Sequence, residues 1–330
     1  MGNLVDKIIN KYNRTFLDVL FRIGFKGEIT SKKGAAILCY HGVDLFGNKK
    51  YNMRFISKKS FEKQLIFFKK HFNVISVDDY HQQKFMLNKF NIAITFDDGY
   101  KNNYKFVYPL LIKYGIPASI FITGLNNTPY NFLWADMLDI FYIHSDKNKL
   151  EFSGIEFEKS NFEYISEHGT SLKKLIKYNG GFAFKQLVIE ELFSEFTHII
   201  NNNPIDDYWE LMTDKEIQEI STSKLISIGS HGYYHNNLAN IDLKEALEEV
   251  ILSKKYLENL VQKPISEIAY PDGSYSRELV TEIDKIGIKK QLVLEYLHTE
   301  DQIDNDVICR HGVYPVYTTS FQLSEIPDLK

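Results

Sequence analysis

The sequence NIAITFDDG, residues 91–99, joins a short apolar run to two adjacent acids and a glycine. An uninterrupted apolar run of this kind is typical of a buried parallel strand, which is covered on both faces. Successive side chains on a strand point to opposite faces, so Asp97 and Asp98 cannot both follow the strand into a core. We therefore expect both acids where the strand has ended and Gly99 lets the backbone turn. The carboxyl ends of buried parallel strands are where α/β enzymes carry their reactive groups.

Length and composition fit one large domain or two small ones. The chain has 330 residues, of which 44% are hydrophobic and 14% aromatic, which is ample for a packed core. The net charge is −4 and the isoelectric point is near 6.2, so we expect no nucleic-acid partner. Cys39 and Cys309 are the only cysteines, and their spacing provides neither a disulfide framework nor a cysteine metal site. This cysteine usage favours a reducing compartment.

Residues 1–32 are predicted to be an N-terminal amphipathic helical segment that precedes a main domain at 33–330. Apolar side chains recur at helical spacing in it, namely Val5, Ile8, Ile9, Tyr12, Phe16, Leu20 and Ile23. Asp18 and Arg22 interrupt the apolar pattern, so we do not expect a signal peptide, and the lack of an 18-residue apolar run argues against a membrane span. Its excess of positive charge leaves two interpretations, a helix packed on the domain or a helix lying on an anionic membrane surface. We expect a cytoplasmic protein, in the second case peripheral at the inner face of the membrane.

Strand and helix patterns alternate along most of the chain. One predicted strand begins at Asn91. The others occupy residues 35–40, 73–76, 118–122, 225–229, 267–270, 290–294 and 307–309. Seven or eight strands that alternate with helices predict an α/β fold with a parallel, barrel-like sheet. Residues from about 125 to 212 interrupt the alternation between two polar clusters, and we predict a mostly helical insertion there.

Polar residues follow the ends of four predicted strands. They are His41, Asp97 with Asp98, His231 with His235, and the Pro-Asp-Gly sequence of 271–273. In a barrel these strand ends converge on one face. Two histidine nitrogens and one carboxylate oxygen are the ligand set of a catalytic zinc with an open position for water. The second carboxylate would then lie beside that water as a general base.

Three motifs resemble those of the NodB-like polysaccharide deacetylases, carbohydrate esterase family 4. They are TFDDG at 95–99, SHGYYH at 230–235 and YPDG at 270–273, in the order of the family. The resemblance covers roughly residues 35–310 outside the insertion. It implies a distorted (β/α)7 barrel and the metal-dependent removal of an N-acetyl group from an amino sugar, usually N-acetylglucosamine.

The same resemblance implies the roles of four residues. Asp97 would be the catalytic base, while Asp98, His231 and His235 would bind one divalent ion. Neutral imidazole and carboxylate ligands favour zinc, although cobalt or nickel could take its place. The partner implied is a carbohydrate substrate.

The third motif departs from the family pattern. An arginine often stands two residues before its proline, where this chain has Ala269, and Arg310 could replace it beside the catalytic base. The usual tyrosine after the proline is Asp272, whose backbone N–H could still serve the oxyanion. Tyr270 and Pro271 complete the predicted oxyanion and substrate-binding group.

The general acid is expected from a second resemblance. The sequence YHGV at 40–43 is similar to the YHxV start of a subgroup that includes biofilm poly-N-acetylglucosamine deacetylases. In that subgroup the barrel is permuted and an N-terminal histidine supplies the acid. We therefore expect His41 to protonate the leaving amine, with His311 and His298 as alternatives.

Two other functions are compatible with these residues. One is a non-catalytic carbohydrate-binding protein of the same fold, which loss of Asp97 or of a metal ligand would mark. The other is a metal-dependent amidase or deformylase that acts on something other than a sugar polymer. For a deacetylase, we expect a sugar intermediate of glycan, capsule or lipopolysaccharide synthesis as the substrate.

Overall fold

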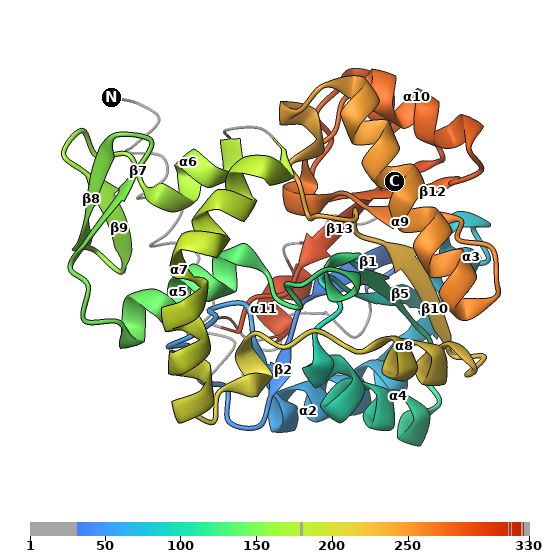
Figure 1. Cartoon of the computed structure of the whole chain (residues 1–330). Helices are drawn as coiled ribbons and strands as arrows, with labels where there is room; N and C mark the ends of the chain where they lie inside the picture. Colours follow the sequence, from blue (N-terminus) through green and yellow to red (C-terminus); the bar gives the residue numbers. More distant parts are fainter. Residues whose placement is uncertain (1–31, 179–180, 316, 318, 325, 327–330) are drawn as a thin grey trace, which may run out of the picture.

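The computed structural model describes residues 32–178, 181–315, 317, 319–324 and 326, and its centre is a closed barrel of seven parallel strands (Figure 1). The strands pair in the ring order β1-β5-β6-β10-β11-β12-β13, and β13 pairs again with β1. They are β1 Gly34–Tyr40, β5 Phe90–Phe96, β6 Ala118–Ile122, β10 Ile226–Ser230, β11 Glu267–Ala269, β12 Lys290–Val293 and β13 Val307–Gly312. The predicted distorted (β/α)7-type barrel is thus confirmed. The predicted helical segment at 1–32 falls outside the described residues except for its last residue.

An eighth strand, β4 (Asn73–Ile75), distorts the barrel. It pairs with residues 91–93 of β5 on the edge that faces β6. Strand β6 therefore pairs with β5 only through Thr95 and Phe96, at the carboxyl end. On its other edge β5 pairs with β1 along its whole length. The most extensive strand pairing of the ring, between β1 and β5, thus leads up to the two acids that follow β5.

Helices cover the outside of the barrel. They are α2 Lys58–His71, α3 Val77–His81, α4 Tyr108–Tyr114, α8 Asp214–Ser221, α9 Leu243–Val261, α10 Arg277–Lys285 and α11 Thr319–Ser324. The short elements are β2 Val43–Asp44, β3 Ile56–Ser57, η2 Asn103–Val107, η3 Leu125–Asn127, η4 Asp206–Tyr208, η5 Leu238–Asn240, η6 Pro271–Gly273 and η7 Thr299–Gln302. Thr213 and Glu216 form a capping box at the start of α8. No helix among the described residues is both long and apolar enough to cross a membrane.

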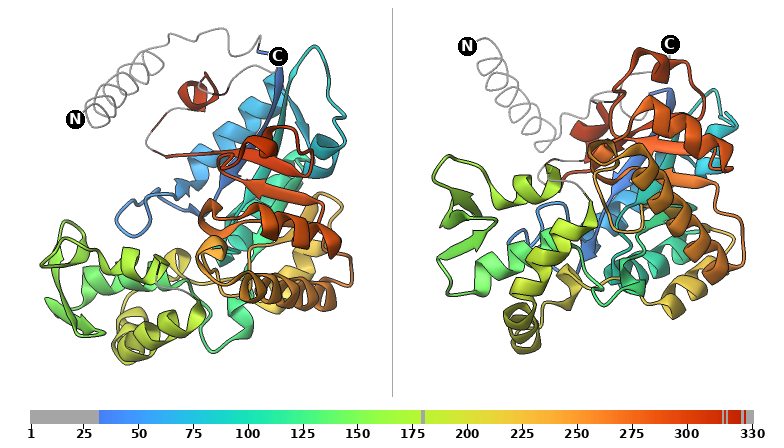
Figure 2. Two further views of the ribbon diagram at one scale, coloured as in Figure 1. Left: turned by 90° about the horizontal axis from the view of Figure 1, so that it is seen from above. Right: turned by 45° about the horizontal axis from the view of Figure 1, so that its top comes forward.

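The segment 125–212 forms a lobe beside the barrel (Figure 2). It contains the helices α5 Trp134–His144, α6 Leu172–Tyr178 and α7 Phe182–Asn202. Between α5 and α6 lies an antiparallel sheet of β7 Lys149–Phe152, β8 Ile155–Ser160 and β9 Glu163–Ser166, which the sequence prediction lacked. Its signal was present, because Leu150 and Phe152 alternate with exposed residues before a turn at Ser153 and Gly154.

Alternation along the strands decides which side chains enter the barrel. Ile37 and Ala93 belong to the interior cluster, whereas Leu38 and Ile94 pack outward with α2. With a period of two, the position after the end of β1 that continues the inward series is His41. The strands therefore direct this histidine toward the centre of the barrel.

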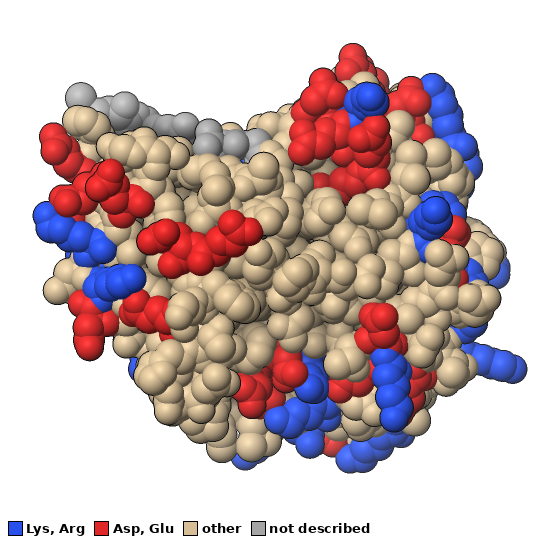
Figure 3. Space-filling model, viewed as in Figure 1, with Lys and Arg blue, Asp and Glu red and all other residues tan. Residues whose placement is uncertain are grey.

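Charged side chains are unevenly distributed on the face drawn in Figure 3. Asp and Glu side chains form one group over the lobe at the left and another near α10 at the upper right. Lys and Arg side chains lie mainly at the margins and do not join into one patch. This face therefore lacks the continuous basic surface that polyanions bind.

The outward core predicts where the fold is sensitive to truncation. Phe61 of α2 is fully buried, with its ring edge-on to those of Tyr40 and Phe96 at centroid distances of 5.5 and 5.6 Å. Phe61→Ala should lower the free energy of unfolding by about 3–5 kcal/mol, because a cavity replaces the ring. Phe46→Ala is the control, since Phe46 is 83% exposed, and should change stability by less than about 0.5 kcal/mol. Urea denaturation measures both variants, and equal effects would contradict this account of the core.

Candidate active site

Asp98, His231 and His235 lie together at the carboxyl ends of β5 and β10. Atom Nε2 of each histidine is 3.3 Å from Oδ1 of Asp98. The side chains of Asp98 and His231 are 1% and 3% exposed, and that of His235 is 12% exposed. The structure therefore brings together the three predicted metal ligands, which lie far apart in the sequence.

Their unpaired atoms fit a divalent ion. Both carboxylate oxygens of Asp98 are buried without a hydrogen-bond partner among the described residues. Leaving such atoms buried and unpaired costs about 1–3 kcal/mol each, and more for a charged group. One ligand atom from each of the three residues lies within 4.8 Å of the others, which is close enough for a shared ion. Two imidazole nitrogens with one carboxylate oxygen are a donor set for zinc and similar metals.

The backbone turns sharply to present Asp98. Its φ angle is +76° and that of Gly99 is +77°, so two successive residues adopt the left-handed conformation. Aspartate tolerates this region better than most residues, and glycine adopts it freely. A Cβ atom at Gly99 would also lie 3.2 Å from Cγ2 of Ile122. The DDG sequence thus provides both the carboxylates and the turn that separates their directions.

Asp97 points into the barrel and pairs with Arg310. Atoms Nη1 and Nη2 of Arg310 donate to its two carboxylate oxygens at 2.6 and 2.8 Å, and Nη1 also donates to Oγ1 of Thr95 at 3.1 Å. The thiol of Cys39 donates to the same carboxylate at 3.3 Å. Burial is the largest single effect and raises the pKa of Asp97, but the charge and hydrogen bonds of Arg310, together with the charges of His231 and His41, hold the pKa at about 2. Asp97 is therefore an ionised, oriented carboxylate beside the candidate metal ligands.

His41 lies beside Asp97, whereas the two alternative histidines lie elsewhere. A ring nitrogen of His41 is within 4.8 Å of a carboxylate oxygen of Asp97. Burial, and then the charge of Arg54, lower the pKa of His41 to about 4. His311 lines an outer groove with Leu38 and Tyr40. His298 caps η7, so of the three candidates the structure brings only His41 to this site.

The third motif packs against the loop that holds the histidines. Asp272 has a φ angle of +58°, and its Oδ1 accepts from Nζ of Lys177 at 2.9 Å. The hydroxyl of Tyr270 donates to Gln291, so its side chain lies in the outward core. Pro271 contacts Gly232, where a Cβ atom would lie 3.3 Å from Cγ of the proline. Of this group, Asp272 lies near the candidate metal ligand His235. Burial raises the pKa of Asp272, but the charge of His235 and other nearby cations lower it.

Three basic residues near the site were not predicted from the sequence. Nη2 of Arg54, in the loop between β2 and β3, is 3.8 Å from Oδ2 of Asp98, and its side chain is 40% exposed. Lys177 and Lys185 reach motif residues from the insertion, where no motif marked them. Each is a single basic residue in an unremarkable stretch, so only the tertiary contact identifies it.

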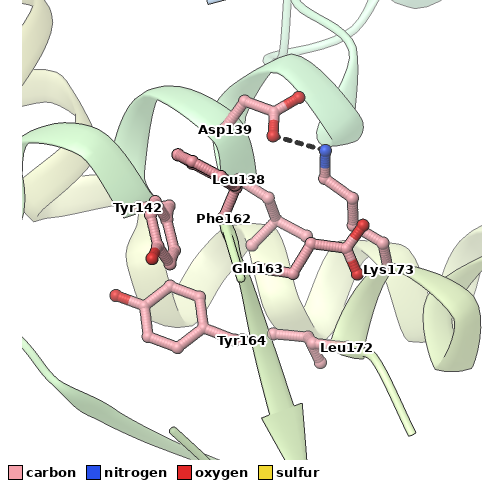
Figure 4. Close-up of a pocket in the computed structure, with 8 residues that line it drawn as sticks. All are labelled: Leu138, Asp139, Tyr142, Phe162, Glu163, Tyr164, Leu172 and Lys173. Atoms are coloured by element: carbon pink, nitrogen blue, oxygen red, sulfur yellow. Dashed lines mark hydrogen bonds and ion pairs between the residues drawn. The ribbon is translucent and has the colours of Figure 1, made fainter. Parts of the chain in front are cut away.

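A small hollow in the insertion is separate from this site (Figure 4). It is lined by Leu138, Asp139, Tyr142, Phe162, Glu163, Tyr164, Leu172 and Lys173. Lys173 and Asp139 form an ion pair at its edge, as Figure 4 shows. None of these eight residues is a predicted site residue, so the hollow adds nothing to the metal cluster.

The three ligands predict the metal content of their variants. Alanine at Asp98, His231 or His235 should abolish stoichiometric binding of a divalent ion, because two remaining ligands seldom hold one. Metal analysis after dialysis, with zinc or cobalt supplied, measures the occupancy. Full occupancy in the doubly substituted protein His231→Ala, His235→Ala would disprove the assignment.

Comparisons of sequence agree with this geometry. A model of the polysaccharide deacetylase family matches residues 86–174 and 188–290, more than half of the chain. The first matched range continues into the insertion as far as residue 174. The protein YxkH of Bacillus subtilis (strain 168), a candidate polysaccharide deacetylase, is 58% identical over 33 residues. That alignment covers 10% of this chain and 12% of the relative, so most of the relative's length is not matched.

Solved structures show the same fold. The deacetylase PplD of Streptococcus pyogenes, in complex with acetate, has a TM-score of 0.54 at 16% identity, covering 86% of this chain and 94% of that one. IcaB from Ammonifex degensii has a TM-score of 0.54 at 15% identity, covering 88% of this chain and 95% of that one. With a fold of this kind and a family model matching more than half of its length, the chain belongs to the polysaccharide deacetylase family.

Proposed function

We propose that this protein is a metal-dependent hydrolase that removes N-acetyl groups from an amino sugar of the N-acetylglucosamine type, in a glycan or a glycan precursor. The main observation behind the proposal is that Asp98, His231 and His235 lie together beside the ionised Asp97. Membership of the polysaccharide deacetylase family supports a carbohydrate substrate. The YHGV sequence supports the subgroup with an N-terminal acid.

Asp98, His231 and His235 would hold the ion, which we propose to be zinc. When bound, it would polarise the acetyl carbonyl and make a water molecule more acidic. The buried position of all three ligands favours this chemistry, because charges interact more strongly where water is excluded. Arg54 adds positive charge to a site where negative charge develops on the acetyl oxygen, and the backbone N–H of Asp272 is the proposed second oxyanion donor.

Asp97 would accept the proton of the attacking water as general base. Arg310 and Cys39 fix the orientation of its carboxylate through three hydrogen bonds. The proton would then pass to His41, since a ring nitrogen of His41 lies within 4.8 Å of a carboxylate oxygen of Asp97.

His41 would then donate this proton to the leaving amine. Cleavage of the C–N bond without protonation would expel a strongly basic amide anion, whereas a protonated nitrogen leaves as an amine. One proton thus passes from water through Asp97 and His41 to the amine nitrogen. The atoms balance, since water and the N-acetyl sugar yield acetic acid and the free amine, which at neutral pH become acetate and the ammonium form of the amino sugar.

Acetate release tests the function directly. We expect the metal-loaded protein to release acetate from at least one of three classes, nucleotide sugars, lipid-linked sugars and chitooligosaccharides. Asp97→Asn is the control and should keep the ion while losing at least about 100-fold in turnover, the scale of a general base. Activity confined to amides that are not sugars would favour an amidase or deformylase. A metal-loaded protein that binds these sugars without turnover would be a carbohydrate-binding protein.

The acid role predicts a dependence on the leaving group. His41→Ala should retain the ion but lose about 100-fold or more in turnover of N-acetyl sugars, because the amine nitrogen lacks its proton donor. It should spare an activated aryl acetate ester, whose leaving group needs no proton. His311→Ala provides the comparison, since His311 lines the outer groove, and should behave as wild type. Equal losses on both substrates in His41→Ala would argue against the acid role.

A further inference from the structure

We infer that Lys185, on helix α7 of the insertion, is a positioning residue for the metal ligand His235, so that the insertion completes the metal centre of the barrel. The inference rests on the proposed metal site. It concerns how the third ligand is held rather than which residues bind the ion.

The two histidine ligands are oriented differently. His231 places its Nδ1 2.8 Å from the carbonyl oxygen of Ala269, while its Nε2 faces Asp98. His235 also faces Asp98 through Nε2, but its Nδ1 is buried without a partner among the described residues. Metal-binding histidines are usually oriented by a hydrogen bond from the second ring nitrogen. The ring of His235 lacks that support, so its direction must come from its backbone.

The backbone of His235 adopts an unfavourable conformation. Its φ angle is +53°, in the left-handed region that residues with a Cβ atom rarely occupy. Such a conformation persists only where surrounding contacts hold it. The contacts that hold residues 231–236 are therefore part of the metal site.

Glu249 of α9 holds the amide groups of this loop. Its Oε1 accepts from the backbone N–H groups of Tyr233, Tyr234 and Asn236 at 3.0–3.3 Å. These bonds lie on both sides of His235, but none of them involves its carbonyl group. These contacts from the barrel therefore hold the amide groups around His235 but not its carbonyl group.

Lys185 supplies the missing contact. Its Nζ donates to the carbonyl oxygen of His235 at 2.7 Å and to Oδ1 of Asn236 at 2.7 Å. Asn236 in turn donates from Nδ2 to Oε2 of Glu249 at 2.7 Å. The loop is thus enclosed between a cation of the insertion and an anion of the barrel.

The burial of Lys185 shows that this contact is specific. The residue is only 1% exposed, and its ammonium group lies 5.8 Å from the ring centroid of Trp134. A buried ammonium group is costly unless its donors are satisfied. The partners found for Nζ are both in the metal-ligand loop. Removing the ammonium group would leave the His235 carbonyl and the Asn236 amide oxygen without this donor, and the loop could relax away from its left-handed conformation.

Metal affinity of the whole chain tests the inference. Lys185→Met keeps an unbranched side chain over Trp134 but removes the donor. The dissociation constant for zinc, measured on metal-free protein by competition with a chromophoric chelator, should rise about 10- to 100-fold, as for other residues that orient a ligand. Lys174→Met, at an exposed lysine of α6, is the matched control and should bind like wild type. The visible absorption of the cobalt-loaded Lys185→Met protein should also change, because it reports ligand geometry.

The possible results separate the inference from the proposed function. Wild-type protein that binds no stoichiometric ion would refute the metal site itself. Wild type that binds zinc, with a folded Lys185→Met protein of unchanged affinity and cobalt spectrum, would overturn the inference alone. If Lys185→Met loses the near-ultraviolet circular dichroism of the native fold, Lys185→Leu, which also lacks a donor, takes its place with the same expected results.

Discussion

The buried pair of Arg310 and Asp97 joins the last strand of the barrel to the strand that carries the acids. Strand β1 lies between β13 and β5, so the pair crosses β1 inside the ring. The thiol of Cys39 on β1 bonds the same carboxylate, and all three neighbouring strands therefore meet at Asp97. Breaking such a buried pair by removing one partner typically costs about 3–5 kcal/mol. The contact that links β13 to the end of β5 inside the barrel thus also helps to keep a carboxylate ionised there.

Around this pair the site separates two acids that are neighbours in the chain. Asp97 is hydrogen-bonded by Arg310, whereas both oxygens of Asp98 lack a hydrogen-bond partner among the described residues and face His231, His235 and Arg54 instead. The left-handed turn at Asp98 and Gly99 makes the separation possible, because it sends successive carboxylates to different partners. A fully paired carboxylate suits proton transfer, and an unpaired one beside two imidazoles suits a cation.

The insertion is part of the same chemical unit. Lys177 contacts Asp272 in the third motif, and Lys185 contacts the loop of the second motif. Both lysines come from the α6–α7 region, which lies beside the strand ends rather than against the far end of the barrel (Figure 1). The lobe thus contacts all three motif loops, since the backbone N–H of Met212 also donates to the carbonyl oxygen of Gly99 in the first motif at 2.9 Å.

The sequence alone predicted the barrel and singled out Asp98, His231 and His235 as candidate metal ligands, because strands leave local signals and the motifs resemble those of a known family. Buried parallel strands are short apolar runs, and their carboxyl ends are marked by acids, histidines and glycines that few other structures need. The sheet β7–β9 also left a local signal, the alternation around Leu150 and Phe152, but it was overlooked within a mostly helical pattern.

Only the tertiary structure decided the contacts between distant segments. The sequence only suggested that Arg310 could lie beside Asp97. The order of strands in the ring places β13 close enough for this contact. Because Arg310 points into the barrel and adjacent strand residues face opposite sides, its neighbour His311 points outward. His41 is therefore the candidate histidine that lies beside Asp97. Arg54 and Lys185 had no sequence signal, because a single basic residue looks the same on a surface and in a site. What distinguishes them is the burial and charge of the groups they meet, and these exist only once the chain has folded.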